Sequence, residues 1–456
     1  MSSIEVETPT LARRPAGIPG VRVGWRIFSL IASFALVVYF QQRSLTIASA
    51  RIMPELNLSQ MQVGWLQWAL VLAYTVFQFP GGLLGQRLGS HITLGITLSL
   101  AVAATLAVPA LSSVLDGGLL YVVLLLTQFV LGMAQGPFMP VCAGVMQAWL
   151  PERNWALAQG LHTLSGHVGN ILAPPLLAAL TVWLGWRSGL FWAALPPIVL
   201  IAIWIFYARD TPAQHPAVSA AELADLAVVH VPSPTLARQP AGMLRQIGQI
   251  LTDADILRVT VSYVFMNYMY YLVANWCFLY LVQELHFRIL EGGVLASLPP
   301  IGAAAGGLLG GMMTAACCRR FGARWGYRLV PLVALPLGGI ALYSVAMGPD
   351  AYLAVGILVF AFFAIELCES SYWAGMMQIA RTESMAACGV MNCGGNVGGL
   401  IGIPIVAWLS GHQAWKLAFF SGAACSICAA GLWLFIDASG STTPAKAGSP
   451  MPAGEG

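Results

Sequence analysis

The sequence predicts an all-α membrane protein in which twelve transmembrane helices form two pseudo-symmetric six-helix bundles. The first observation is composition: 58% of the 456 residues are hydrophobic and only 9% are charged, whereas about a quarter of a soluble domain is charged. The second is a series of twelve apolar runs, each long enough for the ~20 residues that cross a bilayer. The third is a long polar stretch between the sixth and seventh runs, which indicates an internal duplication.

The apolar runs follow one another with short polar connections. They lie near residues 24–42, 61–84, 92–112, 118–149, 154–183, 187–207, 257–284, 291–316, 326–347, 351–379, 384–409 and 414–436. They divide the chain into an N-terminal tail (1–23), a first bundle (24–208), a linker (209–255), a second bundle (256–437) and a disordered C-terminal tail (438–456).

Basic residues give the orientation, because loops rich in Lys and Arg stay in the cytoplasm. When both termini and the linker are placed there, sixteen of the 21 Lys and Arg residues lie on that side and four on the other. The first ~20 residues are polar and the first apolar run is long enough to remain, so no cleavable signal peptide is expected. The sequence thus predicts a multi-pass protein of the cytoplasmic (inner) membrane with both termini cytoplasmic.

Other classes of function find no support in the sequence. Nine Cys residues are scattered, most of them in apolar runs, and no spacing resembles a metal site. No stretch resembles an ATP-binding loop, and no nucleophile–base pair suggests an enzyme. We therefore expect no cofactor, no metal, no nucleic-acid partner and no enzymatic activity, and we expect a monomer embedded in the lipid bilayer.

Three charged residues are expected in the membrane interior, away from the loops, tails and span ends. Arg43 follows the first run, in "YFQQRSLTIAS", and is the one basic residue that neither side accounts for. Glu366 and Glu369 lie near the middle of the tenth run, and their i, i+3 spacing puts them on one helix face. A charge at mid-bilayer costs at least ~2.5 kcal/mol on insertion scales, so such residues usually face a cavity and mark a pathway.

A loop after the second run indicates a superfamily. "GLLGQRLGSH" begins at Gly82 and resembles the signature G-x-x-x-D-R-x-G-R-R of the major facilitator superfamily, with matches at Gly82, Arg87 and Gly89 and a glutamine in place of the Asp. In that superfamily this loop is a gating latch. A basic loop that obeys the charge rule would by itself explain Arg87. The resemblance implies the major facilitator fold.

Further strings resemble one family within that superfamily, the anion:cation symporters, which include sialin, the vesicular glutamate transporters and bacterial sugar-acid carriers. The most specific is "RDTPAQHPAVSAAE" at the end of the sixth run. "QQRSLTIA", "YTVFQFPGG" and "WLPERNWALAQG" match other family strings, and the likeness extends from about residue 36 to residue 436. It implies transport of a small organic anion, with no cofactor.

The resemblance also implies site residues. The first-helix arginine of the family, which grips the substrate carboxylate, corresponds to Arg43. The remaining positions that the family uses around the substrate correspond to Phe40, Tyr74, Ser370, Trp373 and Asn392.

The family pattern breaks at three polar positions. Gln42 stands where the family has an acid before the arginine, Gln128 replaces an arginine, and Gln135 replaces a glutamate. The two carboxylates are tied to proton coupling in relatives, whereas glutamine has no titratable proton. The familiar coupling route in the first bundle is therefore absent, and these glutamines are expected to be polar cavity residues.

Three interpretations of Arg43 remain open. It captures an anion through its bidentate fork, it forms a structural ion pair with Glu366 or Glu369 across the cavity, or its side chain extends to the membrane surface. The first two can alternate within one transport cycle.

The candidates for coupling lie elsewhere. Two neighbouring carboxylates in a low-dielectric site can share a proton, which makes Glu366 and Glu369 candidates, although a polar helix–helix contact would also explain them. His167 is a third candidate because histidine titrates near physiological pH; a packing role is the alternative. Tyr271 and Asn275, in an aromatic-rich helix, either line the cavity or belong to an interface belt.

These observations predict a secondary transporter that moves a small organic anion by alternating access, with protons as the candidate coupling ion. An uncoupled uniporter or exchanger of the same fold is one alternative. A membrane sensor that has lost transport is another.

Overall fold

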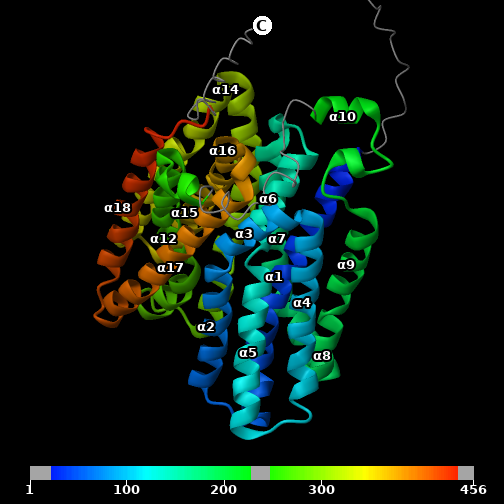
Figure 1. Cartoon of the computed structure of the whole chain (residues 1–456). Coiled ribbons are helices and arrows are strands. Elements are labelled where there is room, and N and C mark those ends of the chain that lie inside the picture. The colour runs from blue at the N-terminus through cyan, green and yellow to red at the C-terminus, as the bar shows by residue number, and fades with distance from the viewer. Residues whose placement is uncertain (1–21, 227–246, 440–456) are drawn as a thin grey trace, which may run out of the picture.

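The structure is a computed structural model that describes residues 22–226 and 247–439. Within these residues every regular element is a helix, and the helices run side by side in two bundles (Figure 1). Most of the N-terminal tail, the middle of the linker and nearly all of the C-terminal tail, including its expected disorder, lie outside the described residues.

The first bundle contains six spans, three of which are broken. The unbroken spans are α1 (Val23–Glu55), α4 (Ser90–Leu111) and α7 (Trp155–Leu184). The broken spans are the pairs α2 (Gln60–Val76) with α3 (Gln78–Leu88), α5 (Gly117–Gln135) with α6 (Phe138–Trp149), and α8 (Trp186–Ala193) with α9 (Leu195–Tyr207). The α2/α3 pair bends by 49°.

The second bundle repeats this plan. Its helices are α12 (Ala254–Gln283), α13 (Ile289–Leu295), α14 (Leu298–Ala346), α15 (Ala351–Leu367), α16 (Glu369–Ala380), α17 (Ser384–Gly411) and α18 (Trp415–Trp433). At 1.5 Å per residue, a straight α14 would measure about 73 Å, more than twice the thickness of a bilayer core. It turns at Gly322, whose φ of +74° suits glycine, and so supplies two spans.

Twelve spans are present in the described chain, as predicted. Eight continuous helical stretches are long and apolar enough to cross a membrane, and the bent pair α2/α3 makes a ninth. Two of the eight, 291–346 and 351–411, are hairpins that each contain two spans. The more polar α12, with 30 residues, completes the set.

One boundary differs in a way that matters for the site. The apolar run was expected to end at residue 42, but α1 continues to Glu55. Leu45, Ala48 and Ile52 continue the apolar face of the helix and are buried against α2, α5 and α8. Arg43 therefore lies inside α1 and not at its end.

The described part of the linker closes over the start of α1. The Glu222 carboxylate, on α10 (Ala220–Leu226), accepts hydrogen bonds from the backbone N–H groups of Val23 and Gly24, at 3.3 and 2.9 Å. An acid at this position satisfies free N–H groups and complements the helix dipole. Asp225 pairs with Arg22 and with Arg153, the latter at 2.8 Å. We call this end of the molecule, where α1 begins, α10 lies and α18 ends, the linker face (Figure 1).

We expect Glu222→Ala to lower the free energy of unfolding by roughly 1 kcal/mol, because α1 loses the acid at its N-terminus. Thermal unfolding in detergent measures this, with Glu284→Ala at the end of α12 as the matched control. Equal unfolding temperatures for Glu222→Ala and the control would contradict this role of Glu222.

The neighbouring Asp225 makes the stability of this end of the molecule depend on pH. Hydrogen bonds from Arg153 and Arg22 lower the pKa of Asp225 from its ordinary 3.8. The stabilising contribution of Asp225 is therefore complete above that value and is lost as the pH falls through the lower pKa of the folded state.

Candidate functional site

A cavity of about 630 Å³ lies between the two bundles, a volume typical of small-molecule sites. Helices α1, α2, α5, α6 and α7 line it from the first bundle, and α12, α15, α16 and α17 line it from the second. The polar and aromatic lining residues are Tyr39, Gln42, Arg43, Gln67, Tyr74, Gln128, His162, Thr163, His167, Asn170, Tyr263, Asn267, Tyr270, Tyr271, Asn275, Glu366, Glu369, Trp373, Asn392 and Asn396.

Arg43 presents its guanidinium to this cavity. Its Nε donates a hydrogen bond to Oδ1 of Asn170, on α7, at 3.1 Å. The structure records no partner for its two terminal nitrogens among the described residues, and the side chain remains exposed. Asn170 thus fixes the plane of the guanidinium and leaves the forked edge free, which is the edge that binds a carboxylate by two parallel hydrogen bonds.

One contact between the bundles at the cavity involves a histidine and not the arginine. Nε2 of His167, on α7, lies 3.2 Å from Oε2 of Glu366, on α15, and the two side chains are 12% and 5% exposed. The structure records no ion pair between Arg43 and either glutamate. The Arg–Glu pair offered as one interpretation of Arg43 is therefore absent from this conformation.

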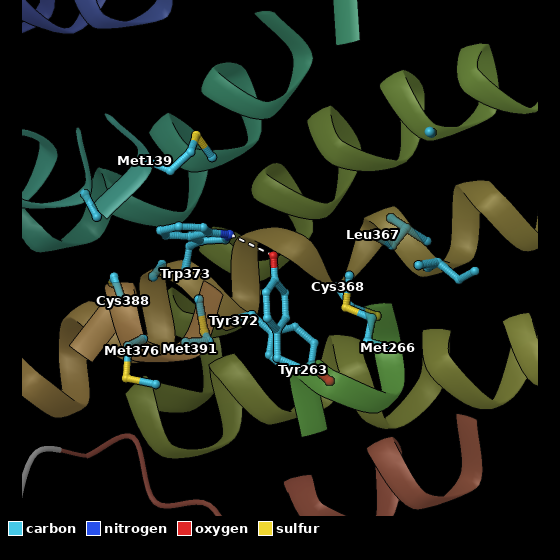
Figure 2. Packing of buried hydrophobic residues seen from close by; sticks show 14 of the residues in the cluster. Met139, Tyr263, Met266, Leu367, Cys368, Tyr372, Trp373, Met376, Cys388 and Met391 are labelled. Carbon is cyan, nitrogen blue, oxygen red and sulfur yellow. Dashed lines mark hydrogen bonds between the residues drawn. The ribbon is translucent and has the colours of Figure 1, made fainter. Parts of the chain in front are cut away.

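Glu369 is held by two donors from the second bundle. Its Oε1 accepts a hydrogen bond from the Tyr263 hydroxyl at 2.8 Å and another from Nε1 of Trp373 at 2.7 Å. Figure 2 shows the third side of this triangle, a hydrogen bond of 3.3 Å from Trp373 Nε1 to the Tyr263 hydroxyl. Within the described chain no donor is recorded for Oε2, and Glu369 is one of the cavity-lining residues.

Most of the residues predicted for the site do line the cavity. They are Arg43, Tyr74, Trp373, Asn392, Glu366, Glu369, His167, Gln42, Gln128, Tyr271 and Asn275. Tyr271 donates to Oδ1 of Asn396 at 2.9 Å, and its ring packs edge-on against Tyr270. These placements bring the guanidinium of Arg43 and the carboxylates of Glu366 and Glu369 to one cavity.

Three predicted residues lie elsewhere. Phe40 packs among apolar residues of α7 and α8 that include Ala173 and Leu177; each helical residue rotates the side chain by ~100°, and Tyr39 takes the cavity position. Ser370 is fully buried, with no hydrogen-bond partner recorded for its hydroxyl. Gln135 is also fully buried, behind the cavity wall, where its amide donates to Gln41 at 3.4 Å.

Sequence reasoning missed Asn170, which positions Arg43. A signal was present, because Asn170 follows His167 by three residues in "GHVGN" and so shares its helix face. It also missed Tyr39, Gln67, Asn267 and Asn396, whose polarity in otherwise apolar helices was the available indication.

The two bundles meet closely on the linker face. A Cβ at Gly82, on α3, would lie 2.3 Å from the carbonyl oxygen of Met385, on α17. The Gln147 amide donates to the carbonyls of Arg381 and Met377, at 2.8 and 3.3 Å. Within residues 22–226 and 247–439, each hydrogen bond or ion pair that we find between the bundles lies here or at the cavity. We call this set of contacts the linker-face seam.

Gly89 and Arg87, the other residues of the predicted gating loop, have no recorded contact with the second bundle in the described chain. Gly89 has a φ of +87°, and a Cβ there would lie 2.4 Å from the Asp210 carboxylate, so only glycine allows the approach. Asp210 accepts a hydrogen bond from the backbone N–H of His91 at 2.8 Å. Arg87 forms the last turn of α3, and the structure records no partner for its buried Nε.

We expect Gly82→Ala to open the linker-face seam more often, because overpacking of this kind costs roughly 1–3 kcal/mol. The buried Cys388 on α17 should then react faster with a maleimide, as followed by mass spectrometry of the purified protein. The matched control is Gly64→Ala, since a Cβ at Gly64 meets nothing within 4 Å. Unchanged Cys388 reactivity in Gly82→Ala would show that this contact does not limit opening.

Two six-helix bundles around a central polar cavity define a membrane carrier. The sequence profile of the Major Facilitator Superfamily matches residues 31–380, and the chain belongs to that superfamily.

Known proteins support the same assignment. The probable galactarate/D-glucarate transporter GarP of Escherichia coli (strain K12) is 27% identical over 397 residues, which are 86% of this chain and 89% of that one. The probable galactarate/D-glucarate transporter GudP of Bacillus subtilis is 26% identical, over 76% of this chain and 77% of that one. Human sialin is 22% identical, over 80% of this chain and 73% of that one. These relatives confirm the resemblance to the anion:cation symporters, and they are transporters, not enzymes, by name.

Solved structures share the fold. The proton:xylose symporter XylE superposes with a TM-score of 0.69 at 12% identity, over 91% of this chain and 96% of that one. The Escherichia coli fucose:proton symporter FucP superposes with a TM-score of 0.68 at 13% identity, over 91% of this chain and 100% of that one.

Proposed function

We propose that the protein carries a small organic anion across the cytoplasmic membrane by alternating access. The observation that supports this most directly is Arg43, whose guanidinium is oriented by Asn170 and offers its forked edge to the cavity between the bundles. Such an edge fits a carboxylate or a sulfonate. The relatives are named for galactarate, glucarate and sulfoacetate, which are all organic anions.

Alternating access fits the distribution of contacts between the bundles. In this proposal the linker-face seam closes one end of the cavity. Its close packing depends on glycines at positions such as Gly82. Parting this seam would expose the cavity to the linker face without disrupting either bundle. The site would then be reached from each side in turn, as in carriers built from two repeats.

We assign coupling to the second bundle. Gln42, Gln128 and Gln135 carry no titratable proton, whereas Glu366 and Glu369 lie at the cavity with His167 opposite. The His167–Glu366 contact joins the two bundles, so a proton taken up there would change a contact that must break during the cycle. The same three glutamines favour uncoupled exchange or uniport as the second candidate.

Uptake into proteoliposomes tests the proposal. The purified protein is first screened for carboxylates that raise its unfolding temperature, because a ligand that binds the folded state stabilises it. Acids that do so should then be transported by the reconstituted protein. Binding without transport would support the sensor interpretation, and an imposed pH gradient separates symport from exchange or uniport.

We place the linker face in the cytoplasm, since most basic residues lie on that side. A single Cys introduced at the exposed position Ala220 on α10 should not react with an impermeant maleimide added to intact cells. Val114, which is 77% exposed between α4 and α5, gives the matched control and should react when changed to Cys. Labelling at position 220 from outside would reverse the topology.

A further inference from the structure

The walls of the cavity carry opposite charges. On the first bundle, Arg43 is the one lining residue of fixed positive charge among the described residues, and Asn170 holds it in place. On the second bundle, the acids Glu366 and Glu369 face it. A molecule that fills the space between the bundles therefore meets a cation at one end and carboxylates at the other.

The side chains that contact Arg43 and Glu366 lie close together on α7. Asn170 and His167 are three residues apart on α7, so their side chains lie about one helical turn, ~5–6 Å, from each other. Asn170 contacts the guanidinium of Arg43, and His167 contacts the carboxylate of Glu366. A small acid bound at Arg43 consequently places its opposite end near the two glutamates.

One carboxylate oxygen of Glu369, Oε2, is available to accept a hydrogen bond from the far end of the bound acid. Tyr263 and Trp373 occupy its Oε1 and fix the orientation of the carboxylate, while Oε2 has no recorded donor in the described part of the chain. A substrate hydroxyl or ammonium group can donate to Oε2. A second substrate carboxylate would instead meet like charge and leave both groups without a partner, which is how a buried polar site rejects the wrong ligand.

We propose that Glu369 is a specificity-determining residue that selects monocarboxylates whose far end carries hydroxyl or ammonium donors, and rejects dicarboxylates. This inference rests on the proposed function and names its substrate class. It separates the protein from its relatives GarP and GudP, whose names include galactarate and glucarate, both dicarboxylates. The sulfonate of sulfoacetate would be disfavoured at this end for the same reason.

Two matched sets of acids test the proposal by calorimetry on the purified full chain at pH 8.5, where free carboxylates are ionised. The six-carbon set is gluconate, glucarate and hexanoate; the four-carbon set is 4-hydroxybutyrate, succinate and butyrate. In the set that fits the cavity, the hydroxylated monocarboxylate should bind at least tenfold more tightly than the dicarboxylate and the unsubstituted acid. Equal or tighter binding of the dicarboxylate would overturn the proposal.

Substitutions assign the effect to one side chain. Glu369→Gln removes the charge and keeps a side chain of similar size. It should lower the ratio of the monocarboxylate affinity to the dicarboxylate affinity by at least tenfold. Glu369→Asp keeps the charge and should keep the rejection, which a merely structural role for Glu369 would not predict. Glu284→Gln, at the end of α12, controls for the loss of an acid. An unchanged preference in Glu369→Gln would contradict the inference.

The outcome also distinguishes this inference from the function on which it rests. Tight binding of dicarboxylates to the wild-type protein, lost in an Arg43 variant, would leave anion transport standing and remove the specificity claim alone. If no acid of either set binds and the broader carboxylate screen also finds no ligand, the anion site itself is wrong and both proposals fall.

Discussion

Replacing Arg43 with lysine is expected to abolish high-affinity anion binding while the fold survives. Lysine keeps the positive charge but loses the planar fork, and it cannot use Asn170 to hold a two-pronged edge toward the cavity. Hydrogen bonds to charged groups contribute about 1.5–3 kcal/mol each, so the loss of one prong should weaken binding roughly 10- to 100-fold. Arg43→Ala should remove binding altogether.

Calorimetry or ligand-induced thermal stabilisation measures both variants, and size-exclusion chromatography verifies that they fold. Arg51→Lys is the matched control, because Arg51 lies two turns further along α1 and is not among the cavity-lining residues. If Arg43→Lys binds and transports as well as the wild type, bidentate recognition is excluded.

Replacing either Glu366 or Glu369 with glutamine is expected to eliminate pH-driven accumulation while leaving counterflow exchange. Exchange needs only an anion site that alternates, whereas accumulation needs a group that takes up a proton on one side and releases it on the other. An anion bound at Arg43 neutralises the positive charge nearest to these carboxylates, so anion and proton favour each other's binding, as linkage requires. The pair takes up one proton, so that one of the two carboxylates remains ionised and still repels a second substrate carboxylate. His167, in contact with Glu366, is the reserve carrier of the proton.

Proteoliposomes with an imposed pH gradient measure accumulation, and vesicles preloaded with substrate measure counterflow. Glu284→Gln provides the matched control. Restoring acids by Gln42→Asp together with Gln135→Glu should shift the pH profile. Normal accumulation in both second-bundle variants would exclude this route, and a wild-type protein that ignores the gradient would establish exchange or uniport.

The sequence predicted the architecture well because spans are set by local hydrophobicity. It also placed Glu366 and Glu369 on the cavity, since their charge stands out within an apolar helix, and the family resemblance placed Trp373 there. The prediction that Phe40 lines the cavity was off by one residue, because Tyr39 lines it instead. A match between strings aligns positions along the chain, whereas the rotation of the helix decides which of two adjacent aromatic side chains faces the cavity.

Contacts between distant segments were not predictable in the same way. His167 and Glu366 are 199 residues apart, and neither residue identifies its partner until the bundles are docked. Glu222 belongs to a string that was recognised at once, yet its role in capping α1 appears only when α10 is folded over Val23 and Gly24. The sequence singled out His167, Glu366 and Glu222, whereas the structure identifies the residues that they contact.

The linker-face seam has a consequence for how the carrier responds to its surroundings. The recorded contacts of Gly82 and Gln147 across it involve glycine, an amide and backbone carbonyls. Dissolved ions screen charged pairs but scarcely alter contacts between neutral groups. The rate at which these contacts part should therefore vary little with ionic strength, so that the response of the seam to salt depends on its charged member, the Glu383 carboxylate, which accepts a hydrogen bond from the Gln86 amide at 3.2 Å.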